Sequence, residues 1–150
     1  MNLIKQVFAR DREKVRDLLA QGVPVNQSDS KGRTALMHAV IGKDTEMSEL
    51  LLKSGADPNV QDATGNTALH YAAQEYAPDI AEMIVHHGGG VDVTDEHGNT
   101  PLGRAVFASH GRMGVIDVLL RAGADKNRKN NHGVSPADLA KSIANYKIAL

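Results

Sequence analysis

The stretch that decides the fold is Gly65-Asn66-Thr67-Ala68-Leu69. It recurs as Gly32-Arg33-Thr34-Ala35-Leu36 and as Gly98-Asn99-Thr100-Pro101-Leu102, with a weaker copy at Gly133-Val134-Ser135-Pro136-Ala137. The glycines that open the four stretches are 33, 33 and 35 residues apart. A fixed period of this length indicates a repeat architecture, in which each unit buries its apolar face against its neighbours.

A second series of glycines recurs in step with the first. Leu51-Leu52-Lys53-Ser54-Gly55 resembles Leu119-Leu120-Arg121-Ala122-Gly123, and Gly22 and Gly88 hold the same place in two further copies. Each of these glycines lies ten residues before the next opening glycine. Because the two series keep one register along the whole chain, the repeat is a structural unit and not a chance similarity.

One unit carries the signals of two helices. The hydroxyl residues placed to cap a helix N-terminus are Thr34, Thr67, Thr100 and Ser135. Pro101 and Pro136 follow at the first helical position, where a missing N–H has no cost. The pattern predicts a short helix over residues 68–74 and a second over about 79–86, which Gly88 ends. The connection to the next unit is rich in Gly, Asn, Asp and Pro, which predicts a projecting turn or short hairpin.

The pattern G-x-T-[AP]-L-H-x-A followed by L-L-x-x-G-A-D-x-N resembles the ankyrin repeat, over essentially all 150 residues. The resemblance implies an all-α solenoid of stacked helix-turn-helix units with short hairpin or turn fingers, and a concave face of fingers and first helices. We expect one domain, with terminal units that depart from the pattern because each has a single neighbour. Its predicted parts are an N-terminal capping repeat over 1–31, full repeats over 32–64, 65–97 and 98–132, and a C-terminal cap over 133–150.

The departures from the family pattern are specific. The motif His is present only as His70, for which the resemblance implies a hydrogen bond between neighbouring repeats. Its place in the other units is taken by Met37, Gly103 and Asp138. The next position, where the family usually has Leu, is held by His38, Tyr71 and Arg104. The third repeat has two extra residues within 107–114, which predict a flexible loop between its helices.

Charge is uneven along a chain whose net charge is −1. Residues 1–43 have a balance of +4, residues 44–96 a balance of −10, and residues 97–150 a balance of +5. A nucleic-acid binder needs a continuous basic face, so this distribution argues against one. The acidic middle would suit a partner with a basic surface, although the same acids could simply lie on solvated helix faces.

Composition excludes further classes of protein. Because the chain has no Cys, disulfides, thiolate nucleophiles and cysteine-bound metals are impossible. No stretch has the length of a membrane span, and the first apolar residues are interrupted too soon for a secretory signal. We therefore expect a cytoplasmic protein that does not enter a membrane, and we predict a monomer.

No motif points to catalysis, a cofactor or a metal. His86 and His87 lie in the last turn of a predicted helix, where a cationic side chain favours the helix dipole. His97 and His132 hold equivalent finger positions one repeat apart, too far to share one ion. The run Gly88-Gly89-Gly90 is a helix stop without the Lys-Ser/Thr of a phosphate loop. The sequence predicts that the protein is not an enzyme.

Surface recognition is the function that remains. In ankyrin-like folds the residues that vary at the finger tips and along the first helices usually contact the partner. The candidates at the tips are Lys31, Arg33, Asn66, Glu96, His97, Asn99 and His132. The candidates on the first helices are His38, Tyr71, Glu75, Tyr76, Arg104 and Phe107. Because aromatic residues and Arg dominate interface hot spots, Tyr71, Tyr76, Arg104 and Phe107 are the most informative, although Phe107 could instead pack against the inserted loop.

We therefore predict a rigid, non-enzymatic scaffold that docks a partner protein on its concave face. Free-standing ankyrin chains of this length resemble inhibitors, such as immunity proteins that block a bacterial toxin. The acidic middle would suit a nucleic-acid-cleaving toxin, whose active site is basic. The alternative is a structural or interaction module excised from a larger multidomain ankyrin protein, which the abrupt end at Leu150 suggests.

Overall fold

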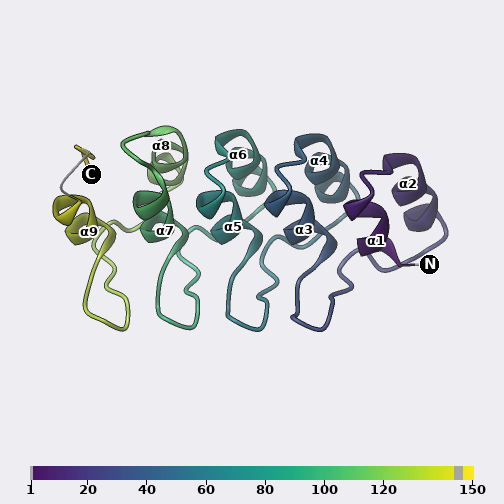
Figure 1. The fold of residues 1–150 in the computed structure, drawn as a ribbon, viewed down its shortest axis with the longest axis horizontal. Coiled ribbons are helices and arrows are strands. Elements are labelled where there is room, and N and C mark those ends of the chain that lie inside the picture. Colours follow the sequence, from purple (N-terminus) through teal and green to yellow (C-terminus); the bar gives the residue numbers. More distant parts are fainter. Residues whose placement is uncertain (1, 144–146) are drawn as a thin grey trace.

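The computed structural model describes residues 2–143 and 147–150 and shows an all-α chain (Figure 1). Within these ranges the only β-pairing is an isolated bridge between Ser28 and Thr34. The helices are α1 (Leu3–Phe8), α2 (Arg12–Ala20), α3 (Ala35–Ile41), α4 (Thr45–Lys53), α5 (Ala68–Gln74), α6 (Pro78–His86), α7 (Pro101–Ala108), α8 (Gly114–Arg121) and α9 (Pro136–Ser142). Residues 144–146, which belong to the predicted C-terminal cap, lie outside the described residues.

The helices form two rows, and the loops between successive pairs project from them (Figure 1). The first helices α1, α3, α5, α7 and α9 make one row, in which each contacts the next. The second helices α2, α4, α6 and α8 make the other row. Four extended loops project from the side of the first row that faces away from the second row, and we call these loops the fingers. The predicted all-α solenoid with fingers is confirmed.

The capping residues begin the first helices where the sequence predicts. The hydroxyls of Thr34, Thr67, Thr100 and Ser135 each accept a hydrogen bond from the backbone N–H three residues further on. Helix α5 has the predicted bounds, whereas α6 begins one residue earlier than expected, at Pro78. Proline suits this first helical position for the same reason as Pro101 and Pro136 do in α7 and α9.

The core lies between the two rows and is aliphatic. Leu36, Leu69 and Leu102, which follow the capping residue by two in successive first helices, are at most 1% exposed. Met47 and Ile80 fill the same core from the second helices. Because every unit buries its apolar residues against its neighbours, the stack holds its fingers and first helices in one continuous surface.

Candidate protein-binding surface on the fingers and first helices

One side chain closes each finger by accepting hydrogen bonds from the backbone of the finger tip. Asp62 Oδ1 accepts from the N–H groups of Thr64 and Asn66, at 3.0 Å in both cases. The residues with the same role in the other fingers are Asp29, Asp95 and Asn130. A side chain of this kind stabilises a turn because it satisfies N–H groups that have no partner in a helix or a sheet.

The second carboxylate oxygen of each Asp binds the first helix that follows its finger, at the residue nine positions further along the chain. Asp29 Oδ2 lies 2.8 Å from His38 Nε2. Asp62 Oδ2 accepts a hydrogen bond from the hydroxyl of Tyr71. Asp95 Oδ2 accepts one from Arg104 Nη2 at 2.7 Å. These three contacts, which we call the finger–helix ties, explain why the position after the motif His is polar in this chain.

The finger–helix ties change the predicted partner surface. Tyr71 is only 4% exposed, and the side chains of His38 and Arg104 are 8% and 23% exposed. Tyr71, which is predicted to contact a partner, has a buried ring and a hydroxyl that is bound within the chain, so its contact with a partner stays a prediction. Arg104 also donates to Gln74 Oε1 of the preceding repeat at 2.9 Å. His38, Tyr71 and Arg104 therefore fix the fingers to the first helices and contribute little exposed area to the surface.

The buried carboxylates of the ties stay ionised. Burial raises the pKa of Asp62, but hydrogen bonds from Tyr71, from Thr64 and from backbone N–H groups outweigh it and hold the pKa below its ordinary value. The pKa of Asp95 is lowered in the same way, by backbone N–H groups and by Arg104. Burial and the hydrogen bond to Asp62 raise the pKa of Tyr71, so the phenol stays protonated and remains a donor.

Neighbouring fingers are joined to each other through their backbones. Ala63 N–H donates to Lys31 O, and Glu96 N–H donates to Thr64 O, at 3.0 Å in both cases. The opening glycine permits this approach: a Cβ atom added to Gly65 would lie 2.9 Å from Glu96 N. The opening glycines Gly32, Gly65 and Gly98 therefore have a second cause besides turn conformation, namely the contact between fingers, which is missing at Gly133.

His70 joins two repeats from a fully buried position. Its Nδ1 lies 3.0 Å from the hydroxyl of Thr67, and its Nε2 lies 2.9 Å from the carbonyl oxygen of Asn99 in the next finger. Burial lowers the pKa of His70, so the imidazole is neutral at pH 7. The hydrogen bond between repeats that the sequence pattern implies is present.

The comparison with known families agrees with this geometry. A family model described as ankyrin repeats (3 copies) matches residues 3–96 and, in a second placement, residues 49–130. The chain belongs to the ankyrin-repeat family. A search of curated proteins found no match. Ankyrin repeats are generally protein–protein interaction modules, and proteins built from them are typically non-enzymatic scaffolds.

Several predicted contact residues of this ankyrin chain are exposed where a partner could reach them. Phe107, on α7, is 76% exposed. It follows Arg104 by three residues, so it lies on the face of α7 that the finger–helix tie uses. The exposed finger-tip residues are Lys31, Glu96, His97 and His132, while Arg33, Glu75 and Asn99 are partly exposed. Contact of these residues with a partner remains a proposal.

Asn66 and Tyr76, which are also predicted to contact a partner, are both buried and bonded within this ankyrin chain. Asn66 donates from Nδ2 to Thr64 Oγ1 within its own finger, at 2.8 Å. Tyr76 donates from its hydroxyl to the carbonyl oxygen of Arg112, whose guanidinium lies 4.3 Å from the centre of the Tyr76 ring. Tyr76 thus binds the lengthened loop of the third repeat to the repeat before it.

Phe8 is an exposed residue that sequence reasoning missed. It ends α1, is 67% exposed, and its ring centre lies 4.7 Å from that of His38. Phe8 lies 33 residues before Ile41 and therefore holds the place of Phe107 in the ankyrin register. The first unit lacks the G-x-T-x-L opening, and extension of the period beyond that motif is the signal that would have found Phe8.

The acidic middle of the ankyrin chain supplies fewer free charges than its composition suggests. Asp62 and Asp95 are buried in the ties, and Asp44 caps α4 beside Arg12, 3.6 Å away. The exposed acids in the middle of the second-helix row are Glu46, Asp79 and Glu82. They lie in α4 and α6, away from the fingers. Every helix within the described residues is too short or too polar to cross a membrane.

Proposed function

We propose that this ankyrin chain is a protein-binding scaffold that docks a partner protein on its finger–helix face, the surface formed by the fingers and the first helices. The observation that carries the proposal is the exposure of Phe107 beside the fixed side chain of Arg104. An aromatic side chain that is left in water on a rigid surface has the character of an interface hot spot. The general role of ankyrin repeats in protein–protein interaction supports the same function.

The finger–helix face is organised before a partner arrives. The ties fix the first three fingers to the helices that follow them, and backbone hydrogen bonds fix each finger to the next. A partner therefore does not need to order the fingers on binding, which lowers the entropic cost of association. The arrangement supports a scaffold that recognises the shape of a folded or extended protein segment.

Variants on the two sides of the stack test this proposal. The tagged chain is used to capture proteins from a native lysate, and each captured protein is quantified by mass spectrometry. Phe8→Ala with Phe107→Ala removes exposed aromatic surface from the first helices, whereas the control Met83→Ala trims a partly exposed side chain of α6. We expect a specific partner to be lost with the first variant and kept with the control. A partner that is kept by the first variant and lost with the control contradicts the proposal.

A second, more specific function is inhibition of a basic partner, such as a nucleic-acid-cleaving bacterial toxin. Its support is the exposed pair Asp79 and Glu82 on α6, together with the acidic balance of residues 44–96. Asp79→Asn with Glu82→Gln neutralises these charges without a change of shape. Unchanged association with the captured partner at low salt would count against a basic partner held by this surface.

Three further predictions belong to the same proposal. We propose that the scaffold acts as a monomer, which sedimentation velocity would test, and that it acts in the cytoplasm. We also retain the division into a capping repeat over 1–31, full repeats over 32–64, 65–97 and 98–132, and a C-terminal cap from residue 133.

A further inference from the structure

The interface between α7 and α9, with the finger that precedes α9, differs from the interfaces between the earlier first helices. At the position of the tie residues His38, Tyr71 and Arg104, helix α9 has Leu139. The finger before α9 is closed by Asn130, whose amide donates to Asn99 Oδ1 at 2.9 Å and not to its own helix. The last described unit therefore has no finger–helix tie, and an apolar side chain takes its place.

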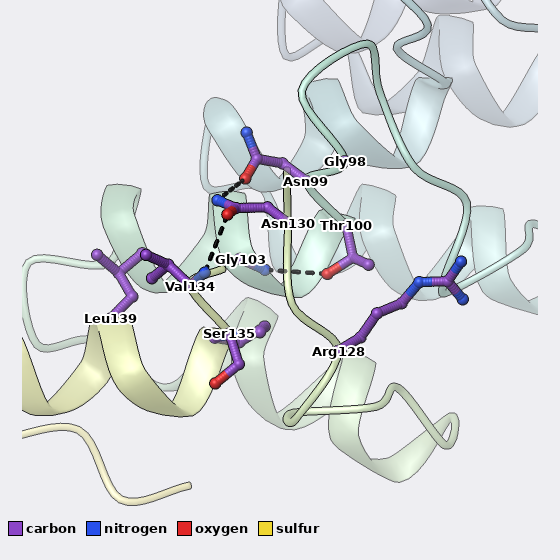
Figure 2. Close-up of a pocket in the computed structure, with 10 residues that line it drawn as sticks. Gly98, Asn99, Thr100, Gly103, Arg128, Asn130, Val134, Ser135 and Leu139 are labelled. Atoms are coloured by element: carbon purple, nitrogen blue, oxygen red, sulfur yellow. Dashed lines mark hydrogen bonds between the residues drawn. The ribbon is translucent and has the colours of Figure 1, made fainter. Parts of the chain in front are cut away.

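A second polar group is missing from the α7–α9 interface because α7 has Gly103 where α5 has His70. No imidazole therefore fills the space between α7 and the next finger. The result is a pocket lined by Thr100, Gly103, Arg128 and Leu139 among others, with Leu139 at one end and Arg128 at the other (Figure 2). A Cβ atom at Gly103 would meet nothing closer than Pro136 Cγ, at 3.8 Å.

This pocket adjoins two hollows beside Phe107. One, of about 200 Å³, shares Gly103 and Leu139 with the pocket and has Phe107 as a further wall. The other, of about 450 Å³, lies between Phe107 and Ile143 and is lined mostly by apolar atoms. We call the three together the α7–α9 groove. Its size suits a bulky aliphatic or aromatic side chain that covers Phe107 and Leu139.

One cation, Arg128, lines the α7–α9 groove, and two more, Lys129 and Lys141, lie on the last finger and on α9, which border it. Arg128 and Lys129 on the last finger and Lys141 on α9 are exposed, and within the described residues none of them forms a salt bridge. Asp138 on α9 accepts hydrogen bonds from Ser135, which lower its pKa together with the weaker effect of the charges of Lys129 and Lys141, so one acid faces these cations. The surroundings of the groove therefore favour negative charge on whatever binds there.

We propose that the α7–α9 groove is the binding site for a protein segment in which a bulky apolar side chain is flanked by Asp or Glu. The apolar side chain packs against Phe107 and Leu139, and the carboxylates face Arg128, Lys129 and Lys141. This inference rests on the proposed function and specifies the partner for one part of the finger–helix face. It predicts the opposite partner charge to that suggested by the acidic middle of the chain.

Two variants separate the loss of the groove from the loss of the fold. Phe107→Ala removes an exposed ring and leaves the core unchanged. Gly103→His fills the groove from the side of α7 and places an imidazole where the second repeat has His70. Because this variant adds the contacts that His70 makes, it blocks the groove while the fold is retained or strengthened. Met83→Ala on α6 is the matched control.

The test is selection of random dodecapeptides displayed on phage against the full chain, followed by affinity measurement with synthetic copies of the enriched peptides. We expect the enriched peptides to combine a bulky apolar residue with Asp or Glu. We expect their affinity to fall at least tenfold with Phe107→Ala and with Gly103→His, and to stay within twofold with Met83→Ala.

Four outcomes overturn the proposal. Enrichment of basic peptides contradicts the charge argument, and full affinity for the Gly103→His variant contradicts the groove. Peptides that lose affinity with Phe8→Ala but not with Phe107→Ala place the site at the other end of the first-helix row, which leaves the proposed function standing. The absence of any peptide bound on the finger–helix face contradicts both.

Discussion

Asp62 does two tasks at once, because one oxygen closes its finger and the other accepts the hydroxyl of Tyr71. We expect Tyr71→Phe to lower the free energy of unfolding by about 1–3 kcal/mol, since the ring is kept and a buried carboxylate loses a donor. Urea unfolding followed by circular dichroism measures the change. The double variant Asp62→Asn with Tyr71→Phe should lower the free energy of unfolding by less than the sum of the two single variants. An unchanged stability of Tyr71→Phe would show that the tie is dispensable.

His70 makes stability depend on pH in a window separate from that of the carboxylates. Burial lowers its pKa, so the unfolded chain binds a proton below about pH 6.5 that the folded chain rejects. The contribution of His70 is therefore present above that pH and is lost as the pH falls. We expect the urea midpoint to fall less between pH 8 and pH 5 in His70→Gln than in the unchanged chain. Equal falls in the urea midpoint would contradict this role of His70. Asp62 and Asp95, whose pKa values are lowered, affect stability in a lower pH window, below about pH 4.

The identity of the tie residues was visible in the sequence, but their role was not. His38, Tyr71 and Arg104 were predicted to contact a partner because they are polar where the family usually has Leu. Each follows an Asp by nine residues, and this spacing is the signal that indicates a tie. The direction in which a long side chain points depends on the finger geometry, which repeat spacing alone does not fix.

Helix α7 is weakened by Gly103, which occupies the position of His70 in α5. A glycine within a helix costs about 0.5–1 kcal/mol relative to Ala, and here the hydrogen bonds of the motif His are missing as well. A Cβ atom has room at this position. We expect Gly103→His to raise the free energy of unfolding by about 1 kcal/mol in urea titrations. A loss of stability would show that the space between α7 and the last finger does not accommodate a side chain at position 103.

The fingers provide a comparison of two glycines with similar backbone conformations. Gly55 and Gly65 have φ values of +89° and +80°, but an added Cβ atom meets nothing at Gly55 and lies 2.9 Å from Glu96 N at Gly65. Gly55→Ala should cost about 1 kcal/mol from backbone strain alone. We expect Gly65→Ala to cost clearly more, because the contact between fingers must also shift. Equal losses in thermal and urea unfolding would mean that the fingers do not support one another.

Element boundaries followed from the sequence wherever the capping residue was clear. Helix α5 was predicted to the residue from Thr67, whereas α6 begins at Pro78 after Ala77, which makes no side-chain cap hydrogen bond. The lengthened loop of the third repeat was recognised from the spacing. Its attachment through Tyr76 and Arg112 could not be predicted, because that contact joins residues 36 apart in different repeats.

For the whole molecule, the period of the glycines predicted the stack of repeats, whereas the arrangement of charged and apolar side chains on its surface became known only from the structure. The charge profile suggested an acidic binding surface, but Asp44, Asp62 and Asp95 act within the chain. Toward the C-terminal end of the first-helix row lie an exposed Phe107 and the exposed cations Arg128, Lys129 and Lys141. The site therefore arises from Gly103, which replaces the motif His of the family, and from Leu139, which is the usual family residue at a position where the earlier repeats of this chain have a polar tie residue.

Hydrogen–deuterium exchange of the chain, alone and bound to the protein that it captures, tests the central claim most directly. We expect protection of the fingers and of α7 and α9, with little change in α4, α6 and α8. Protection confined to the second helices would contradict it, because the partner would then bind the side of the stack opposite the fingers.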